Sequence, residues 1–221
     1  MNEVLPGILE KDFSEIEKKL LVVKPFARVI HIDIIDGKFA SNNTFLDPAP
    51  FAKFSEEFFF EVHMMVDEPV NYLDKFAKSG FKRFIGHVER MSDQVAFVVK
   101  AQKLGEVALG IDLPTPVSVI EVPLIDLDSV LLMSVKAGFS GQKFDISALE
   151  KVKELRSRDA LLNIEMDGGI NESNIAECVS SGASRFVATS YLFSSESFYL
   201  LYLLLSKIRL RIMLKLSLYI R

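Results

Sequence analysis

Short runs of β-branched and aromatic residues recur along the chain and alternate with longer segments of mixed polarity. Such runs predict β-strands, and the apolar spacing of the segments between them predicts helices. The expected strands are residues 4–9, 29–34, 59–64, 84–87, 107–111, 130–133, 163–166 and 185–188. This alternation is typical of a single (β/α)8 barrel, the TIM barrel of the α/β class. An open doubly wound sheet is the alternative.

Composition and charge narrow the class of protein. The chain has 221 residues, of which 49% are hydrophobic and 25% charged, and its net charge is -4. These values fit one globular domain and give no reason to expect a nucleic-acid partner. A lone cysteine, Cys178, excludes an intrachain disulfide, and the first residues are acidic where a signal peptide would be basic. We therefore expect a cytoplasmic protein.

The last 25 residues differ in composition from the rest. Residues 197–221 contain five basic residues and no acidic one, and their charge-free part, residues 197–206, is too short to cross a bilayer. We expect residues 1–196 to form the barrel, with 197–221 as an apolar and basic helix that completes it. A helix lying on a membrane surface is the less favoured alternative, and a tail atypical of its family is a third.

Ligand-type side chains gather at the ends of several expected strands. His31 and Asp33 lie two residues apart in VIHIDIIDG and therefore point to the same face of their strand. His63 ends the next strand, and Asp167 ends the seventh. A single strand histidine is more often a core residue than a ligand, but four such groups at one rim favour a site. Two histidines and two aspartates suit one divalent cation, which could be Zn, Fe, Mn or Co.

The two aspartates also suggest a reaction. Asp33 and Asp167 come from strands far apart in barrel order, so they can reach a substrate from opposite sides. One can remove a proton next to a ketone while the other returns a proton to the opposite face, with the cation stabilising the enediolate. The expected outcome is inversion at that carbon.

Glycine-rich turns after the last three expected strands predict an anion site. Backbone N–H groups in such turns converge on phosphate oxygens, and barrels commonly bind phosphate at these loops. The candidate residues are Gly138, Phe139, Ser140, Gly141, Gly168, Gly169, Thr189 and Ser190.

Several segments together resemble those of the ribulose-phosphate 3-epimerase family. They are PGIL, HIDIIDG, NNT, VHMM, LLMSVKAGFSGQKF, EMDGGI and VATSYLF, in this order. The resemblance implies a ribulose-phosphate-binding type of barrel and an isomerase of the pentose phosphate pathway. Such an enzyme interconverts D-ribulose 5-phosphate and D-xylulose 5-phosphate with one divalent metal ion.

Residue roles and assembly follow from the same resemblance. It implies His31, Asp33, His63 and Asp167 as metal ligands, with Asp33 as proton acceptor and Asp167 as proton donor. It also implies that the three glycine-rich turns bind the phosphate of a ketose substrate and that the protein is a homo-oligomer.

The chain departs from the family pattern at several positions. The expected supporting wall of the site is Gly7, Ile35, Met65 and Met133. Gly7 replaces a serine that would bond substrate, and Ile35 replaces a methionine. Thr189 replaces a glycine and could crowd a phosphate. These changes leave open an epimerase of another ketose phosphate, such as allulose 6-phosphate, or a barrel that binds a phosphosugar without turnover.

Three polar residues near the strand ends have simpler interpretations. We expect Asp36 to organise the turn after its strand, His87 to be a rim residue and not a fifth ligand, and Glu89 to lie in a solvated loop.

Overall fold

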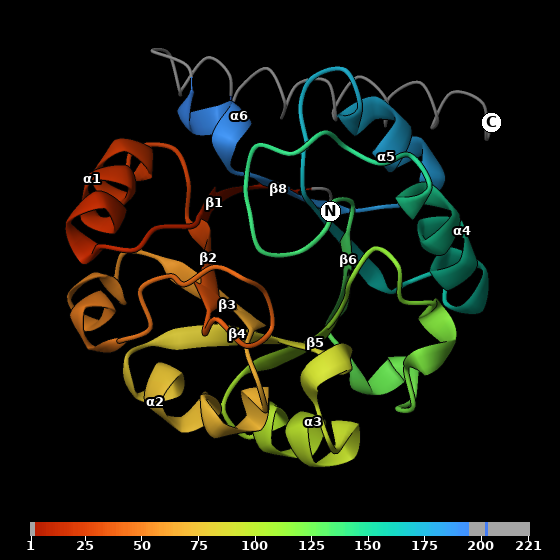
Figure 1. The fold of residues 1–221 in the computed structure, drawn as a ribbon, viewed down its shortest axis with the longest axis horizontal. Helices are drawn as coiled ribbons and strands as arrows, with labels where there is room; N and C mark the ends of the chain where they lie inside the picture. The colour runs from red at the N-terminus through yellow and green to blue at the C-terminus, as the bar shows by residue number, and fades with distance from the viewer. Residues whose placement is uncertain (1–2, 195–201, 203–221) are drawn as a thin grey trace.

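The sheet closes on itself. The computed structural model describes residues 3–194 and residue 202. Within them, each strand pairs in parallel with the next, and the first pairs with the last (Figure 1). The strands are β1 (Glu3–Ile8), β2 (Val29–Ile35), β3 (Phe59–Met65), β4 (Phe81–His87), β5 (Glu106–Ile111), β6 (Ser129–Met133), β7 (Asn163–Asp167) and β8 (Arg185–Ala188). The predicted eight-stranded barrel is confirmed, and the open sheet is excluded.

Helices surround the barrel, but not in every connection. The α-helices are α1 (Phe13–Val23), α2 (Leu73–Lys78), α3 (Gln94–Gln102), α4 (Ala148–Arg158), α5 (Ile175–Ser181) and α6 (Ser190–Phe193). The β2–β3 connection has the 3-10 segment Ala49–Phe54, and the β5–β6 connection has Val117–Val119 and Leu124–Asp126. An α-helix in each of these two connections was the wrong expectation. Their prolines lack the N–H that a helix interior needs.

Strand β4 begins three residues before its predicted start. The strand therefore includes Arg83, whose charge is typical of a surface position and made the prediction start after it. In the structure Arg83 is only 3% exposed. Its guanidinium pairs with Glu61 on β3 and donates to Glu106 Oε2 at 2.7 Å. The barrel interior therefore contains an ion-paired arginine, which a hydrophobic pattern does not reveal.

The apolar residues of the strands form two separate clusters. The larger lies between the sheet and the outer segments and is rich in phenylalanine. The smaller comprises Ile35, Met65, Ile85 and neighbouring interior residues. This division follows from the period of two along each strand, because alternate side chains face the helices and the barrel axis.

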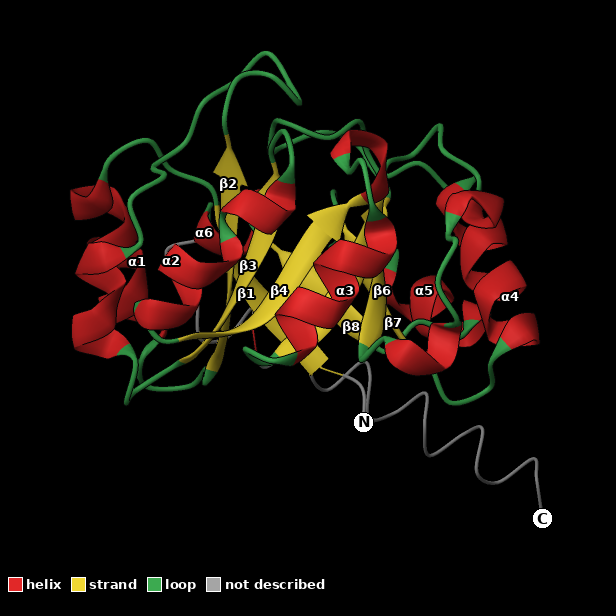
Figure 2. Cartoon of the chain, turned by 90° about the horizontal axis from the view of Figure 1, so that it is seen from below, coloured by secondary structure: helices red, strands yellow, loops and turns green. Residues whose placement is uncertain are grey.

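The carboxyl ends of the strands carry the loops that matter for function. In Figure 2 the arrowheads of β2 and β4 point to the end of the barrel where these loops lie. The expected role of Asp36 in organising the turn after β2 is confirmed, because its Oδ1 accepts from the N–H groups of Lys38 and Phe39. Its Oδ2 accepts from Asp67 N–H and so ties this loop to the one after β3.

The expected terminal helix at 197–221 falls almost entirely outside the described residues. Among residues 3–194 and 202, no helix combines the length and apolar character that a membrane crossing requires.

Truncation of a buried ring tests the outer cluster. Phe81 lies 4.9–5.2 Å, centroid to centroid, from the rings of Phe76, Phe51 and Phe60. Phe81→Ala should lower the free energy of unfolding by about 3–5 kcal/mol, because it leaves a cavity among these rings. Leu161→Ala, at a position 90% exposed, should change it by less than about 0.5 kcal/mol. Equal urea midpoints for the two variants would contradict the packing described.

Candidate active site

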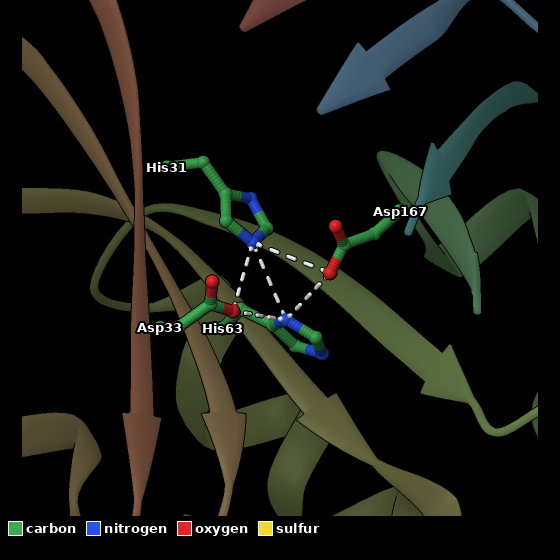
Figure 3. A group of neighbouring side chains, drawn as sticks. All are labelled: His31, Asp33, His63 and Asp167. Carbon is green, nitrogen blue, oxygen red and sulfur yellow. Dashed lines mark hydrogen bonds and ion pairs between the residues drawn. The ribbon is translucent and has the colours of Figure 1, made fainter. Parts of the chain in front are cut away.

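Strand register brings the four predicted ligand residues to one level inside the barrel. Asp33 on β2 lies opposite His63 on β3, and Asp167 is the last residue of β7. His31 lies two residues before Asp33 and faces the same side. All four residues are buried, with exposed fractions of 6% or less for the whole residue. Figure 3 shows them pointing toward one another.

Their donor atoms converge closely enough to bind one cation. His63 Nδ1 lies 2.8 Å from Asp33 Oδ1 and 3.4 Å from Asp167 Oδ2. His31 Nε2 lies 3.3 Å from Asp33 Oδ1, 3.3 Å from His63 Nδ1 and 3.9 Å from Asp167 Oδ2. One donor atom from each residue falls within a group no wider than 4.8 Å. Ligands held at about 2.0–2.2 Å from one ion lie roughly 3–3.5 Å apart, so the donor set fits a divalent cation.

The same proximity controls the charges. Burial opposes the ionisation of Asp33, but the adjacent imidazoles of His31 and His63 outweigh it and lower the pKa of Asp33. Burial disfavours a charged His63, but its hydrogen bonds to Asp167 and Asp33 raise the pKa of His63 to about 9. Asp33 is therefore a carboxylate, the form that a metal ligand or a general base requires.

A layer of charged side chains lies directly beneath this group. Glu61 Oε1 lies 2.6 Å from His31 Nδ1, and Arg83 pairs with the other oxygen of Glu61. Glu165 Oε1 approaches the same His31 nitrogen at 3.3 Å. Burial and the negative charge of Glu61 raise the pKa of Glu165. The hydrogen bond from Nδ1 leaves His31 Nε2 to face the cation position.

Sequence reasoning missed this layer, although a signal was present. Glu61 lies two residues before His63, and Glu165 lies two residues before Asp167. The period of two that placed His31 with Asp33 would also have placed these glutamates on the inner face.

Above the four residues lies an open pocket. Asp33, Asp167, Met65 and Met133 line it, together with all eight residues of the predicted phosphate turns. His31 and His63 lie below it and are fully buried. Gln142 and Tyr191 also line the pocket and were not predicted.

The other two residues of the predicted supporting wall, Gly7 and Ile35, do not reach the pocket. Gly7 and Ile35 are buried, and neither is among the residues that line the pocket. Ile35 packs in the inner apolar cluster instead.

Side-chain hydrogen bonds hold the turns in place. Ser134 Oγ donates to the carbonyl oxygens of Asp167 and Gly168, which joins the ends of β6 and β7. Gly168 and Gly169 have φ values of 114° and 63°, a region where a side chain is strained. Cβ atoms at these positions would also lie 2.5 Å from Val135 Cγ2 and 2.6 Å from Phe144 N, respectively. Glycine is therefore required by both backbone and space.

His87 and Glu89 are less accessible than expected. His87 ends β4, as a rim residue should, but it is fully buried, and among the described residues it is outside the group that could bind the ion. Its Nε2 lies 2.7 Å from His63 Nε2. The side chain of Glu89, 22% exposed, is bonded to His87 Nδ1 and is not simply solvated. The contact between His63 and His87 joins two strands, β3 and β4, so the spacing along either strand does not predict it.

Comparison with known proteins agrees with this geometry. Residues 3–193 match the model of the "Ribulose-phosphate 3 epimerase family". A ribulose-phosphate 3-epimerase of Bacillus subtilis is 36% identical over 208 residues, with 89% of this chain and 94% of the relative covered. The one from Schizosaccharomyces pombe is 32% identical over 203 residues, with 88% of each chain covered.

Solved structures share the fold at low sequence identity. A 3-keto-L-gulonate-6-phosphate decarboxylase from Vibrio cholerae superposes with a TM-score of 0.71 at 11% identity, covering 96% of this chain and 98% of the other. This similarity supports the barrel architecture alone. The family match spans nearly the whole chain and every strand of the barrel, and the chain therefore belongs to the ribulose-phosphate 3-epimerase family.

Proposed function

We propose that this protein is a metal-dependent epimerase that interconverts D-ribulose 5-phosphate and D-xylulose 5-phosphate. The observation that carries the proposal is the position of Asp33 and Asp167 in one pocket, on β2 and β7, beside two buried imidazoles. The named activity of the curated relatives supports the choice of substrate.

The aspartates would perform the proton transfers. Asp33, ionised as argued above, takes the proton from the sugar carbon next to the ketone. Asp167 gives a proton to the opposite face of the same carbon, and the roles reverse for the reverse reaction. A cation held by His31, Asp33, His63 and Asp167 would supply a Lewis acid that stabilises negative charge on neighbouring oxygens.

The glycine-rich turns would bind the phosphate. Gly138, Gly141, Gly168 and Gly169 all have positive φ and line the pocket with Thr189 and Ser190. Turns of this kind direct backbone N–H groups at an anion. Phe139, half exposed at the pocket, would lie over the bound sugar.

Two further properties belong to the proposal. A rice relative carries the name of a cytoplasmic isoform, which supports the expected cytoplasmic location. A homo-oligomeric state and the identity of the ion stay predictions.

Two of the departures from the family pattern are spatially coupled. A Cβ atom at Gly7 would lie 2.3 Å from Thr189 Oγ1 and 2.6 Å from Val187 Cγ1. The side chain of Thr189 therefore occupies space that any larger residue at position 7 would need. This contact favours a joint change at the pocket residue Thr189 and the residue beneath it, and a panel of ketose phosphates including allulose 6-phosphate tests whether it changes specificity.

Isotope exchange separates the roles of the two aspartates. In D2O, Asp33→Asn should stop deuterium entering carbon 3 of ribulose 5-phosphate and lower epimerisation by at least about 100-fold. Asp167→Asn should still exchange that proton through Asp33 but should form no xylulose 5-phosphate. Metal content and circular dichroism of both variants control for ligand loss and misfolding. Unchanged epimerisation in Asp33→Asn would refute its role as the base.

Metal removal tests the cofactor. Dialysis against a chelator should abolish epimerisation, and addition of Zn, Fe, Mn or Co should restore it, because the buried donor set suits these ions. A coupled assay for xylulose 5-phosphate, with metal analysis of each sample, measures this. Full activity in protein shown to be free of metal would contradict the proposal.

A double-mutant cycle tests the coupled wall. Gly7→Ser alone should lower the free energy of unfolding by about 1–3 kcal/mol, because the new side chain overlaps Thr189. Gly7→Ser combined with Thr189→Gly should recover part of that loss, because the contact with Val187 remains, and Thr189→Gly alone completes the cycle. Strictly additive effects in urea unfolding would show that the two positions do not compete for space.

A further inference from the structure

A chain of hydrogen bonds leads from the candidate metal ligand His63 toward the surface. His63 Nε2 lies 2.7 Å from His87 Nε2, and His87 Nδ1 lies 2.9 Å from Glu89 Oε2. The other oxygen of Glu89 accepts the N–H of Asp112 at 2.7 Å. Both oxygens of Glu89 are therefore engaged, and the carboxylate is held in one orientation.

The chemistry of imidazole determines which atom donates in each of these hydrogen bonds. A neutral ring has one nitrogen with a hydrogen and one with a lone pair. His63 Nδ1 is the atom that faces Asp33 and Asp167, so when a cation is bound there, the lone pair of Nδ1 faces the ion and the hydrogen of the ring lies on Nε2. His87 Nε2 must then accept that hydrogen. The hydrogen of His87 consequently lies on Nδ1 and is donated to Glu89.

The surroundings of His87 are shaped to hold its ring. The ring of Phe39 lies against it, with centroids 4.7 Å apart. On the β5 side, a Cβ atom at Gly110 would lie 3.0 Å from His87 Cδ2, so a side chain there would press on the ring in this position. These contacts restrict the ring to the orientation that joins His63 to Glu89.

We propose that Glu89 is a positioning residue that acts through His87 to hold the hydrogen of His63 on Nε2, which leaves Nδ1 free to bind the cation. Without an acceptor at Glu89, His87 can instead place its hydrogen on Nε2. His63 would then carry its hydrogen on Nδ1, where it blocks the cation. This inference rests on the proposed metal site but assigns a role to two residues outside the four ligands.

Cobalt binding to the metal-free protein tests the proposal without an activity assay. The absorption bands of bound Co²⁺ give the dissociation constant directly. Glu89→Leu should weaken binding by about 10- to 100-fold, which is typical of the loss of an outer hydrogen-bond partner. Glu89→Gln should lie between this variant and the wild type, because its carbonyl oxygen can still accept the His87 hydrogen. Glu121→Leu is the matched control, since Glu121 lines the same surface pocket as Glu89 and loses the same charge. Its cobalt affinity should stay within twofold of the wild type.

Two additional measurements distinguish positioning from general structural damage. The chain has three histidines, all of them in this network, so ring ¹⁵N spectra of the metal-free protein, recorded above the pKa of about 9 of His63, resolve the tautomer of each neutral ring. The wild type should show a hydrogen on His87 Nδ1, and Glu89→Leu should lose this preference. His87→Phe should weaken cobalt binding as Glu89→Leu does, and the double variant should be no weaker than either single one, because both act through one chain.

The outcomes separate this inference from the proposed function. Cobalt binding by Glu89→Leu within twofold of the wild type would overturn the positioning role alone. Additive losses in the double variant would overturn it as well. A wild-type protein that takes up no cobalt would overturn the metal site itself, and the inference with it.

Discussion

Ionisable side chains inside a closed barrel can be stable only if each of them has a partner. Removing a charge from water is costly unless hydrogen bonds and opposite charges replace the lost hydration. In this protein a series of buried charged and polar groups bond to one another from the barrel interior toward the pocket. Arg83 pairs with Glu61 and Glu106, Glu61 is bonded to His31, and His31 lies beside Asp33 in the ligand group. The four candidate metal ligands lie at the pocket end of this series of contacts.

Strands and loops supply different groups to the site. The four candidate metal ligands come from the strands β2, β3 and β7, where pairing with neighbouring strands fixes the backbone. Groups suited to an anion come from turns after β6, β7 and β8, whose glycines allow backbone N–H groups to approach a ligand. One pocket thus combines acid and base groups on paired strands with turns whose backbone a ligand can approach closely.

Departures from the family pattern also make physical sense in three dimensions. Gly7 and Thr189 are far apart in sequence, yet the side chain of one occupies the space left by the other. On the opposite side of the barrel, Gly110, which is not among these departures, likewise lies close beside a polar side chain, that of His87. In both cases a glycine on one strand leaves room for the polar side chain of a residue beside it. The effect of a substitution at either position therefore depends on the residue that it contacts.

Much of the fold and the membership of the site could be predicted from the sequence. Strand positions follow from local apolar runs, and the side of a strand that His31 and Asp33 share follows from a period of two. The alternation of eight such runs with helical segments predicted the closed barrel that the structure has, but the partners of each buried charge could not be predicted in this way. They depend on register between strands that are distant in the chain, such as Asp33 opposite His63 or Glu61 beside Arg83. Local pattern thus determined which residues point inward, while only the tertiary structure decided which of them meet, because pairwise contact between strands is not encoded in the spacing along any one of them.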